Sequence, residues 1–299
     1  MNKSTETTYV LITPARNEEK YIDKTLKSVI NQTVLPMKWI IVSDGSTDST
    51  DEIVSRYAAN HEYIQLLRIS HQERRDFSSK VNAFRAGVQQ LKGLEYDFIG
   101  NLDADVSFEP NYFERVLEKF SENAKLGIGG GKVVELQKGE YKERLGDRPW
   151  VVAGAVILFR RRCYEEVGGF IPLKAGGEDS AAQISARMKG WQVRPFDELK
   201  VLHHRPTGTG AGNMWGARFR EGVRDYMLGH HFVYFTAKCL GRIWENPFLF
   251  GTVLRWFGYC FALLSGERKP VSPDFIRFHR REQINKLKSL LKSSGNRGV

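Results

Sequence analysis

FIGNLDADVSFEP, residues Phe98 to Pro110, is an apolar run that ends abruptly at two aspartates one residue apart. The apolar residues are typical of a buried parallel strand. Asp103 and Asp105 follow at the carboxyl end of that strand, and Pro110 is suited to open the next helix. Because ligands bind at the carboxyl edge of open α/β sheets, the stretch predicts a strand that brings carboxylates to a binding site.

The two aspartates allow two interpretations. Carboxylates at positions i and i+2 beyond a strand end point to the same side, which suits a hard cation such as Mg²⁺ or Mn²⁺ held against phosphate oxygens. The same residues could instead form a solvated turn that caps the following helix. This stretch alone does not separate the two interpretations, so the remaining sequence has to do so.

The residues before this stretch alternate between strand and helix patterns. Strand patterns cover residues 9–12, 39–42 and 64–69, and an apolar helix pattern follows each of them. Asn17 is a candidate N-cap for the first helix, and Ser49 and Glu52 have capping-box spacing ahead of the second. This order predicts a doubly wound α/β sheet of the nucleotide-binding kind.

The loops after the first two strands restrict the class of nucleotide site. They lack GxGxxG and GxxxxGK[ST], which argues against a dinucleotide fold and a P-loop. Asp44, at the second strand end, could accept hydrogen bonds from the N–H groups of a pyrimidine or guanine base. Its alternative role is to form a turn with Gly45, and taken alone the residue favours the turn.

The second half of the predicted domain supplies further candidates. Gly176 and Gly177 form a flexible turn, after which Glu178 and Asp179 open a helix that extends to about Met188. Acidic residues are favoured at a helix N-terminus by the helix dipole alone, but a carboxylate there could also act as a general base.

Two short edge strands, residues 191–196 and 200–202, are predicted to close the sheet. The second leads directly into His203 and His204. A lone histidine is more often structural than a ligand, yet a pair just beyond a strand end is compatible with completing a metal site.

These stretches together resemble the family 2 glycosyltransferases, which are inverting nucleotide-sugar enzymes of the GT-A fold. The matching stretches, in the order typical of the family, are VLITPARNEE, WIIVSDGSTDST, FIGNLDADVSFEP, VAGAVILFRR with EVGGF, and GGEDSAAQISARMKGW. They cover residues 9 to about 205. The resemblance implies an α/β fold with a GT-A doubly wound mixed sheet, divided into a nucleotide-binding half and an acceptor half.

The resemblance also implies roles for individual residues. The donor-binding set would be Pro14, Arg16, Glu18, Asp44, Lys80, Asp103 and Glu178, with Lys80 near the diphosphate and Asp103 near the ribose. Asp105 would bind a divalent cation, Mg²⁺ or Mn²⁺, with His203 and His204 as further candidates, and Asp179 would be the catalytic base. The family pattern often has an aromatic residue in place of Arg16, an asparagine in place of Arg85 and an aspartate in place of Ser43, so the details of donor contact are open.

Charge divides the 299-residue chain into two regions. Of 45 Lys+Arg and 35 Asp+Glu, 15 and 6 lie from Gly216 onward, so residues 1–215 carry about +1 and residues 216–299 about +9. We expect a GT-A catalytic domain in the first region and a basic, amphipathic helical region in the second. Three widely spaced cysteines favour a reducing compartment, and the N-terminus has no apolar core of a secretory signal.

The basic region contains an apolar segment, Phe248 to Leu264, in which Arg255 is the only charge. Seventeen residues is short for a membrane span, and basic residues with interfacial aromatics lie on both sides. An in-plane helix on the cytoplasmic face of a membrane fits a central arginine better than a spanning helix does. The alternative is a helix that packs on the catalytic domain or on a homodimer partner.

The sequence therefore predicts a metal-dependent inverting glycosyltransferase at the inner face of the cytoplasmic membrane. Its expected partners are a nucleotide-diphosphate sugar, a lipid-linked or growing polysaccharide acceptor and an anionic membrane surface. A nucleotidyltransferase on a related sheet is one alternative, although the PARNEE loop is acidic where a basic glycine-rich loop is expected. A nucleic-acid-binding module is another, but the basic residues are interleaved with an apolar run, so no nucleic-acid partner is expected.

Overall fold

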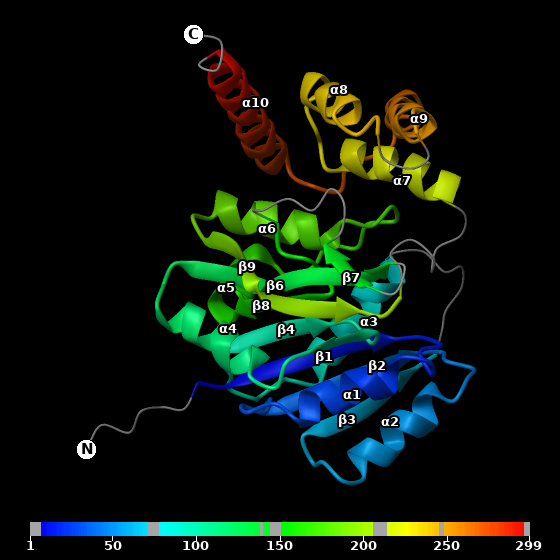
Figure 1. The fold of residues 1–299 in the computed structure, drawn as a ribbon, viewed down its shortest axis with the longest axis vertical. Coiled ribbons are helices and arrows are strands. Elements are labelled where there is room, and N and C mark those ends of the chain that lie inside the picture. The colour runs from blue at the N-terminus through cyan, green and yellow to red at the C-terminus, as the bar shows by residue number, and fades with distance from the viewer. Residues whose placement is uncertain are drawn as a thin grey trace. The chain divides into compact units, whose positions relative to one another are not determined.

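The computed structural model describes residues 7–70, 78–137, 140–143, 151–205, 214–244 and 248–295. The chain forms two compact units (Figure 1). The first comprises Met1–Pro172 and Glu178–Pro206, and the second comprises Leu173–Gly177 and Thr207–Val299.

The first unit is built on one mixed sheet. Its nine described strands are β1 (Tyr9–Ala15), β2 (Lys38–Asp44), β3 (Ile64–Ile69), β4 (Phe98–Leu102), β5 (Val106–Phe108), β6 (Leu126–Gln137), β7 (Glu140–Glu143), β8 (Val156–Arg160) and β9 (Gln192–His203). Their order is β3-β2-β1-β4-β8-β6-β9-β5, with β7 paired to β6. The first four strands in this order are parallel, whereas β8 pairs antiparallel to both β4 and β6. The predicted α/β doubly wound mixed sheet is confirmed.

Helices cover both faces of this sheet because the buried strands carry apolar side chains in both directions. Tyr9 and Leu11 of β1 belong to a core that also contains residues of α1 (Ile22–Ile30), α2 (Thr50–Ala58) and α4 (Tyr112–Ser121). Val10 and Ile12 face the opposite core, with residues of α3 (Ser78–Gln89), α5 (Arg161–Val167) and α6 (Glu178–Met188). The alternation along one strand therefore fixes which helix lies on which face.

Three local predictions are wrong. Asn17 does not cap α1, which begins at Ile22; instead it has a φ of 55° and accepts a hydrogen bond from Thr47 N at 2.8 Å, which joins two loops. The apolar stretch from Val151 to Phe159 is typical of a single strand in the sequence, but the strand begins only at Val156.

The two predicted closing strands are in fact one strand, β9, which lies between β6 and β5 and not at the edge. Gly131 pairs with Phe196 and Lys132 with Lys200, so an irregularity in register absorbs residues 197–199 without ending the strand. Sequence alone placed a break there because this stretch has no alternating apolar pattern.

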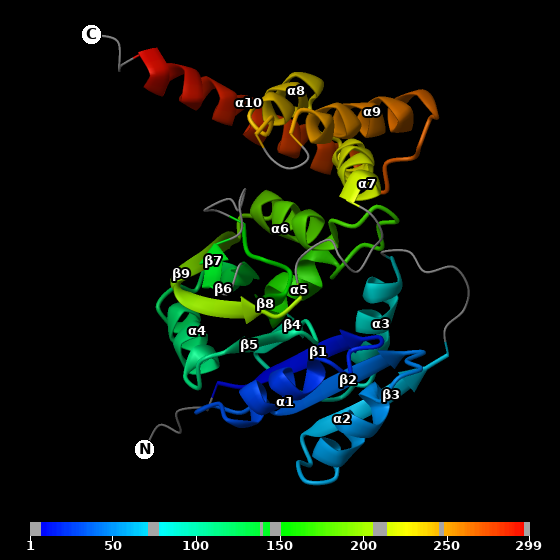
Figure 2. The same cartoon turned by 45° about the vertical axis from the view of Figure 1, so that its right-hand side comes forward.

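The second unit is helical, with α7 (Met214–Met227), α8 (Phe232–Leu240), α9 (Phe250–Leu264) and α10 (Pro273–Gly295) (Figure 2). Helices α7 and α9 approach closely at two glycines. A Cβ atom on Gly222 would overlap the carbonyl oxygen of Arg255, and one on Gly258 would overlap that of Phe219. No helix in the described part of the chain combines the length and the apolarity needed to cross a membrane.

Candidate active site

The turn between β4 and β5 carries the two aspartates of the opening motif. The Asp103 amide donates to the Ala155 carbonyl at 2.8 Å, which anchors the turn to the neighbouring segment. Strand β5 then pairs with the end of β9, and Val106 lies opposite His203 in the register. Sheet pairing thus brings together residues about a hundred positions apart in the sequence.

Asp103, Asp105 and His203 form a group that could hold a metal ion. Each offers one ligand atom, and these atoms lie within 4.8 Å of one another. Carboxylate oxygens with one imidazole nitrogen fit Mn²⁺, and the carboxylates alone fit Mg²⁺. His203 Nε2 lies 3.3 Å from Asp105 Oδ1, and its Nδ1 lies 3.9 Å from Glu135 Oε1. The donor set therefore fits a divalent cation.

The charges in this group depend on one another. Burial favours a raised pKa for Asp105, but the hydrogen bond with His203 and the charges of His203 and Arg205 outweigh it and hold the pKa below its usual value. For His203, burial acts to lower the pKa, and the hydrogen bond and charge of Asp105 raise it above the usual value. Asp105 is thereby kept as a carboxylate, the form that binds a cation.

The two predicted histidines lie differently. His204 Nε2 is 2.9 Å from the Ser107 hydroxyl, and its Nδ1 is 3.4 Å from the Tyr141 hydroxyl. His204 lies one residue beyond the end of β9, where its ring contacts these two hydroxyls. The structure brings His203, and not His204, into the group with Asp103 and Asp105.

Arg205 is a site residue that sequence reasoning missed. Its guanidinium pairs with Glu18 and places Nε 3.4 Å from Asp105 Oδ2. Burial raises the pKa of Glu18 to about 7, with the charge of Arg205 opposing the shift and that of Asp105 adding to it. The only signal in the sequence is that Arg205 directly follows the two histidines.

Lys80 and Asn101 both hold Asp103. Lys80 Nζ lies 2.6 Å from Asp103 Oδ1, and Asn101 Nδ2 donates to the same oxygen at 3.2 Å and to the Gly154 carbonyl at 2.7 Å. Burial acts to lower the pKa of Lys80, but the charges of Asp103 and Glu178 outweigh it and raise it. Asn101 was not predicted, since it lies inside β4 where a buried residue is normally apolar.

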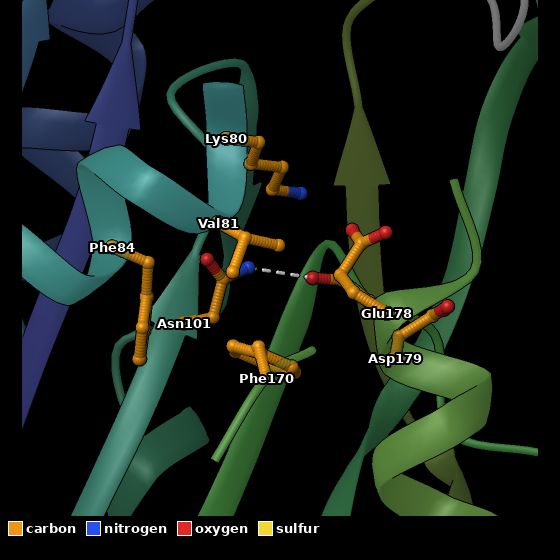
Figure 3. Close-up of a pocket in the computed structure, with 8 residues that line it drawn as sticks. Lys80, Val81, Phe84, Asn101, Phe170, Glu178 and Asp179 are labelled. Carbon is orange, nitrogen blue, oxygen red and sulfur yellow. Dashed lines mark hydrogen bonds between the residues drawn. The ribbon is translucent and has the colours of Figure 1, made fainter. Parts of the chain in front are cut away.

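Glu178 and Asp179 open α6 and line a small cavity with Lys80 and Asn101 (Figure 3). Its volume is about 10 Å³, roughly the space of one water molecule. Burial and the negative charge of Asp179 raise the pKa of Glu178. Asp179 Oδ1 accepts a hydrogen bond from the Ser180 amide at 2.7 Å, so backbone at the helix start orients this carboxylate.

The predicted nucleoside residues lie at the ends of β1 and β2. Pro14 pairs with Val42 in the parallel register, so the segments that follow run side by side. Arg16 Nη1 lies 4.0 Å from Asp44 Oδ2. The charged groups at these two neighbouring strand ends could bind the polar edge of a base and its ribose.

The structure places eleven predicted residues in the first unit, ten of them in three local groups. Asp103, Asp105 and His203 form the first group, with Glu18 joined to it by Arg205. Lys80, Glu178 and Asp179 line one cavity, and Pro14, Arg16 and Asp44 lie at adjacent strand ends. His204 is the one that stays apart.

A family comparison covers most of this unit. Residues 10–182 match the family described as "Glycosyl transferase family 2". The match includes both aspartates of the turn and the Glu178-Asp179 pair, and it ends before the two histidines.

Curated relatives share this region. The poly-beta-1,6-N-acetyl-D-glucosamine synthase of Staphylococcus aureus is 26% identical over 242 residues, which cover 74% of this chain and 56% of that protein. The same enzyme of Staphylococcus epidermidis is 28% identical over 238 residues, covering 71% of this chain and 53% of that protein. The chain spans about half the length of these relatives.

Solved structures share the fold. A mannosyltransferase from Pyrobaculum calidifontis, in complex with GDP-Man and Mn²⁺, has a TM-score of 0.55 at 18% identity and covers 89% of this chain and 78% of its own. TarS 1-349 of Staphylococcus aureus, in complex with UDP-GlcNAc, has a TM-score of 0.55 at 15% identity, covering 91% and 79%.

Proposed function

Because the chain belongs to glycosyl transferase family 2, we propose that it transfers a sugar from a nucleoside diphosphate sugar to a hydroxyl of a lipid-linked or growing glycan, with inversion at the anomeric carbon. The observation that carries this proposal is the Asp103–Asp105–His203 group at one sheet edge, where Lys80 links Asp103 to the Glu178-Asp179 helix start. A leaving diphosphate needs positive charge beside it, which a cation at this group would supply. An attacking hydroxyl needs a base, which a carboxylate at the helix start would supply.

The donor would bind at the carboxyl ends of β1, β2 and β4. Arg16 and Asp44 would contact the nucleoside beside Pro14 and Glu18, and Asp103 would contact the ribose. Asp105 would bind a divalent cation with His203, and the cation would neutralise charge on the leaving diphosphate. Lys80, whose positive charge is reinforced by its carboxylate neighbours, would lie beside the same phosphates.

Asp179 is the proposed general base. It would accept the proton of the acceptor hydroxyl as the oxygen attacks the anomeric carbon. Glu178 would contact the donor. Its pKa is raised because burial and the neighbouring charge of Asp179 make a second negative charge unfavourable. This division leaves one carboxylate of the pair to take up the proton.

A panel of nucleotide sugars with Mg²⁺ or Mn²⁺, scored for donor hydrolysis and thermal shift, tests the proposal. UDP-N-acetylglucosamine comes first, since curated relatives are named for N-acetylglucosamine polymers and TarS was solved with this donor. GDP-mannose comes second.

Asp179→Asn should keep the thermal shift on nucleotide and lower turnover by about 10² to 10⁴. Wild-type turnover in this variant would remove Asp179 from the proposed role.

We also propose that the protein works at the inner face of the cytoplasmic membrane, where a lipid-linked acceptor would be met. The excess of about +9 over residues 216–299, next to exposed aromatic side chains such as Trp244 and Phe257, supports an anionic surface as the partner. The basic residues are interleaved with a long apolar run and do not form one polar face, which does not favour nucleic acid.

A further inference from the structure

The second unit exposes many large apolar side chains on α8, α9 and the turn between them. Leu240, Phe250, Phe257, Phe261 and Leu264 are each more than half exposed, and Leu264 reaches 86%. Helices α8 and α9 lie beside each other in both views (Figures 1 and 2). Exposed apolar residues that are scattered singly over a surface are normal. A group of them on neighbouring elements marks an interaction site.

The only charge of α9 does not interrupt this surface. Arg255 is 1% exposed and its Nε donates to Glu221 of α7 at 2.6 Å. The close approach of α7 and α9 at Gly222 and Gly258 makes this inward position possible. The sequence prediction of an in-plane helix accommodated the arginine at the membrane surface, whereas the structure buries it and leaves the outward face uncharged.

A hollow of about 250 Å³ opens between α8 and α9. It is lined by Thr236, Cys239, Leu240, Thr252, Val253 and Trp256. The Thr252 hydroxyl donates to the Cys239 carbonyl at 3.0 Å. Thr236 Oγ1 is shielded from solvent and has no hydrogen-bond partner in the described part of the chain, so it is the one side-chain oxygen of the lining without such a bond. The solvent-facing lining of the hollow is apolar, so a hydrocarbon occupant that covers it would remove apolar surface from water.

Charge decides between the possible occupants. Residues 216–299 carry about +9, and Arg268, Arg277 and Arg281 are exposed. A second copy of the chain would bring a region of the same charge against this one. An anionic bilayer supplies both hydrocarbon for the apolar surface and negative headgroups for the basic residues.

We propose that the hollow between α8 and α9 binds one acyl chain of an anionic bilayer lipid, while the surrounding apolar side chains lie in the membrane interface. The proposal rests on the proposed membrane location and is independent of the transfer chemistry. The hollow would then hold a lipid chain inside the protein surface, in addition to adsorption of the surrounding side chains on the membrane.

The test compares two valine variants on vesicles of phosphatidylethanolamine and phosphatidylglycerol, part of which carries a photoreactive diazirine on an acyl chain. Val253→Phe fills the hollow, because Val253 lines it and is half-exposed. Val233→Phe is the matched control on α8, exposed and outside the hollow lining. Flotation reports membrane binding, and mass spectrometry locates the cross-link.

Wild-type protein and both variants should float with the vesicles. Wild type and Val233→Phe should be labelled between residues 236 and 256, and Val253→Phe should lose this label by about tenfold. Equal labelling of the two variants would leave membrane binding standing and overturn the lipid-chain site. Wild-type protein that does not float would overturn both. Donor hydrolysis in the same preparations reports on the transferase proposal separately.

Discussion

The two units distribute charge in opposite ways. In the first, Asp103, Asp105 and His203 gather at a sheet edge, where a ligand can reach them. In the second, Asp225 pairs with Lys238 inside the helical core, Arg255 pairs with Glu221, and the outward face of α9 is apolar. The role of an ion pair therefore depends on where it lies. Pairs at the edge are available for chemistry, and pairs in the helical core permit close packing.

The largest effect should come from the edge. Asp105→Asn removes a carboxylate from the group with Asp103 and His203, and we expect turnover to fall by about a thousandfold because a cation would stabilise the leaving diphosphate by several kcal/mol. The Mn²⁺-dependent thermal shift should disappear, while the melting temperature without metal changes little. A normal Mn²⁺ response in this variant would mean that Asp105 is not a ligand.

Substitutions in the buried Arg255–Glu221 pair should change the stability of the protein and not its turnover. Glu221→Gln replaces the carboxylate that accepts from the buried Arg255 Nε at 2.6 Å, so we expect a loss of about 3 kcal/mol in the free energy of unfolding. Arg255→Met should cost less, because Glu221 also pairs with Arg218 at 2.9 Å. Urea denaturation of the two variants measures the difference, and equal losses would contradict this asymmetry.

The glycine contact between α7 and α9 gives a smaller effect. The added methyl of Gly222→Ala would overlap the Arg255 carbonyl oxygen, and we expect it to cost about 2 kcal/mol through forced separation of the helices. Gly241→Ala is the matched control, since its Cβ would find no atom closer than 3.5 Å. If both variants melt with the wild-type protein, the close crossing is not a source of stability.

The smallest effect should come from Gly154, in the first unit. A Cβ there would lie 3.0 Å from Asp179 Oδ2, so Gly154→Ala should displace the proposed base slightly. We expect kcat to fall by about tenfold, with KM for the donor and the melting temperature nearly unchanged. A change in KM alone would assign the position to donor binding.

Much of the first unit could be predicted from local patterns. Buried parallel strands read as apolar runs, and the polar residues that follow them meet at one edge, so Asp44, Asp103 and the Glu178-Asp179 helix start could be located. Arg205 and Asn101 could not, because their roles come from pairing with Glu18 and Gly154, which lie 187 and 53 positions away.

The second unit shows the same limit in another form. The apolar segment around Arg255 and its length were evident in the sequence. The direction of the arginine was not, because it depends on Glu221, on a different helix. A hydropathy pattern locates a charge along a helix, but the neighbouring helix decides whether that charge faces solvent.

The register between β5 and β9 has a consequence for insertions and deletions. Val106 lies opposite His203, and residues 197–199 fit into an irregular stretch of the same strand. Loss of one residue from that stretch would advance the strand end by one position and set His204 opposite Val106. The adjacent histidines would keep an imidazole at that position, but the same shift would turn the buried Val201 to the other face and displace Arg205 from Glu18. The site therefore depends on the register of β9 as well as on the identity of its residues.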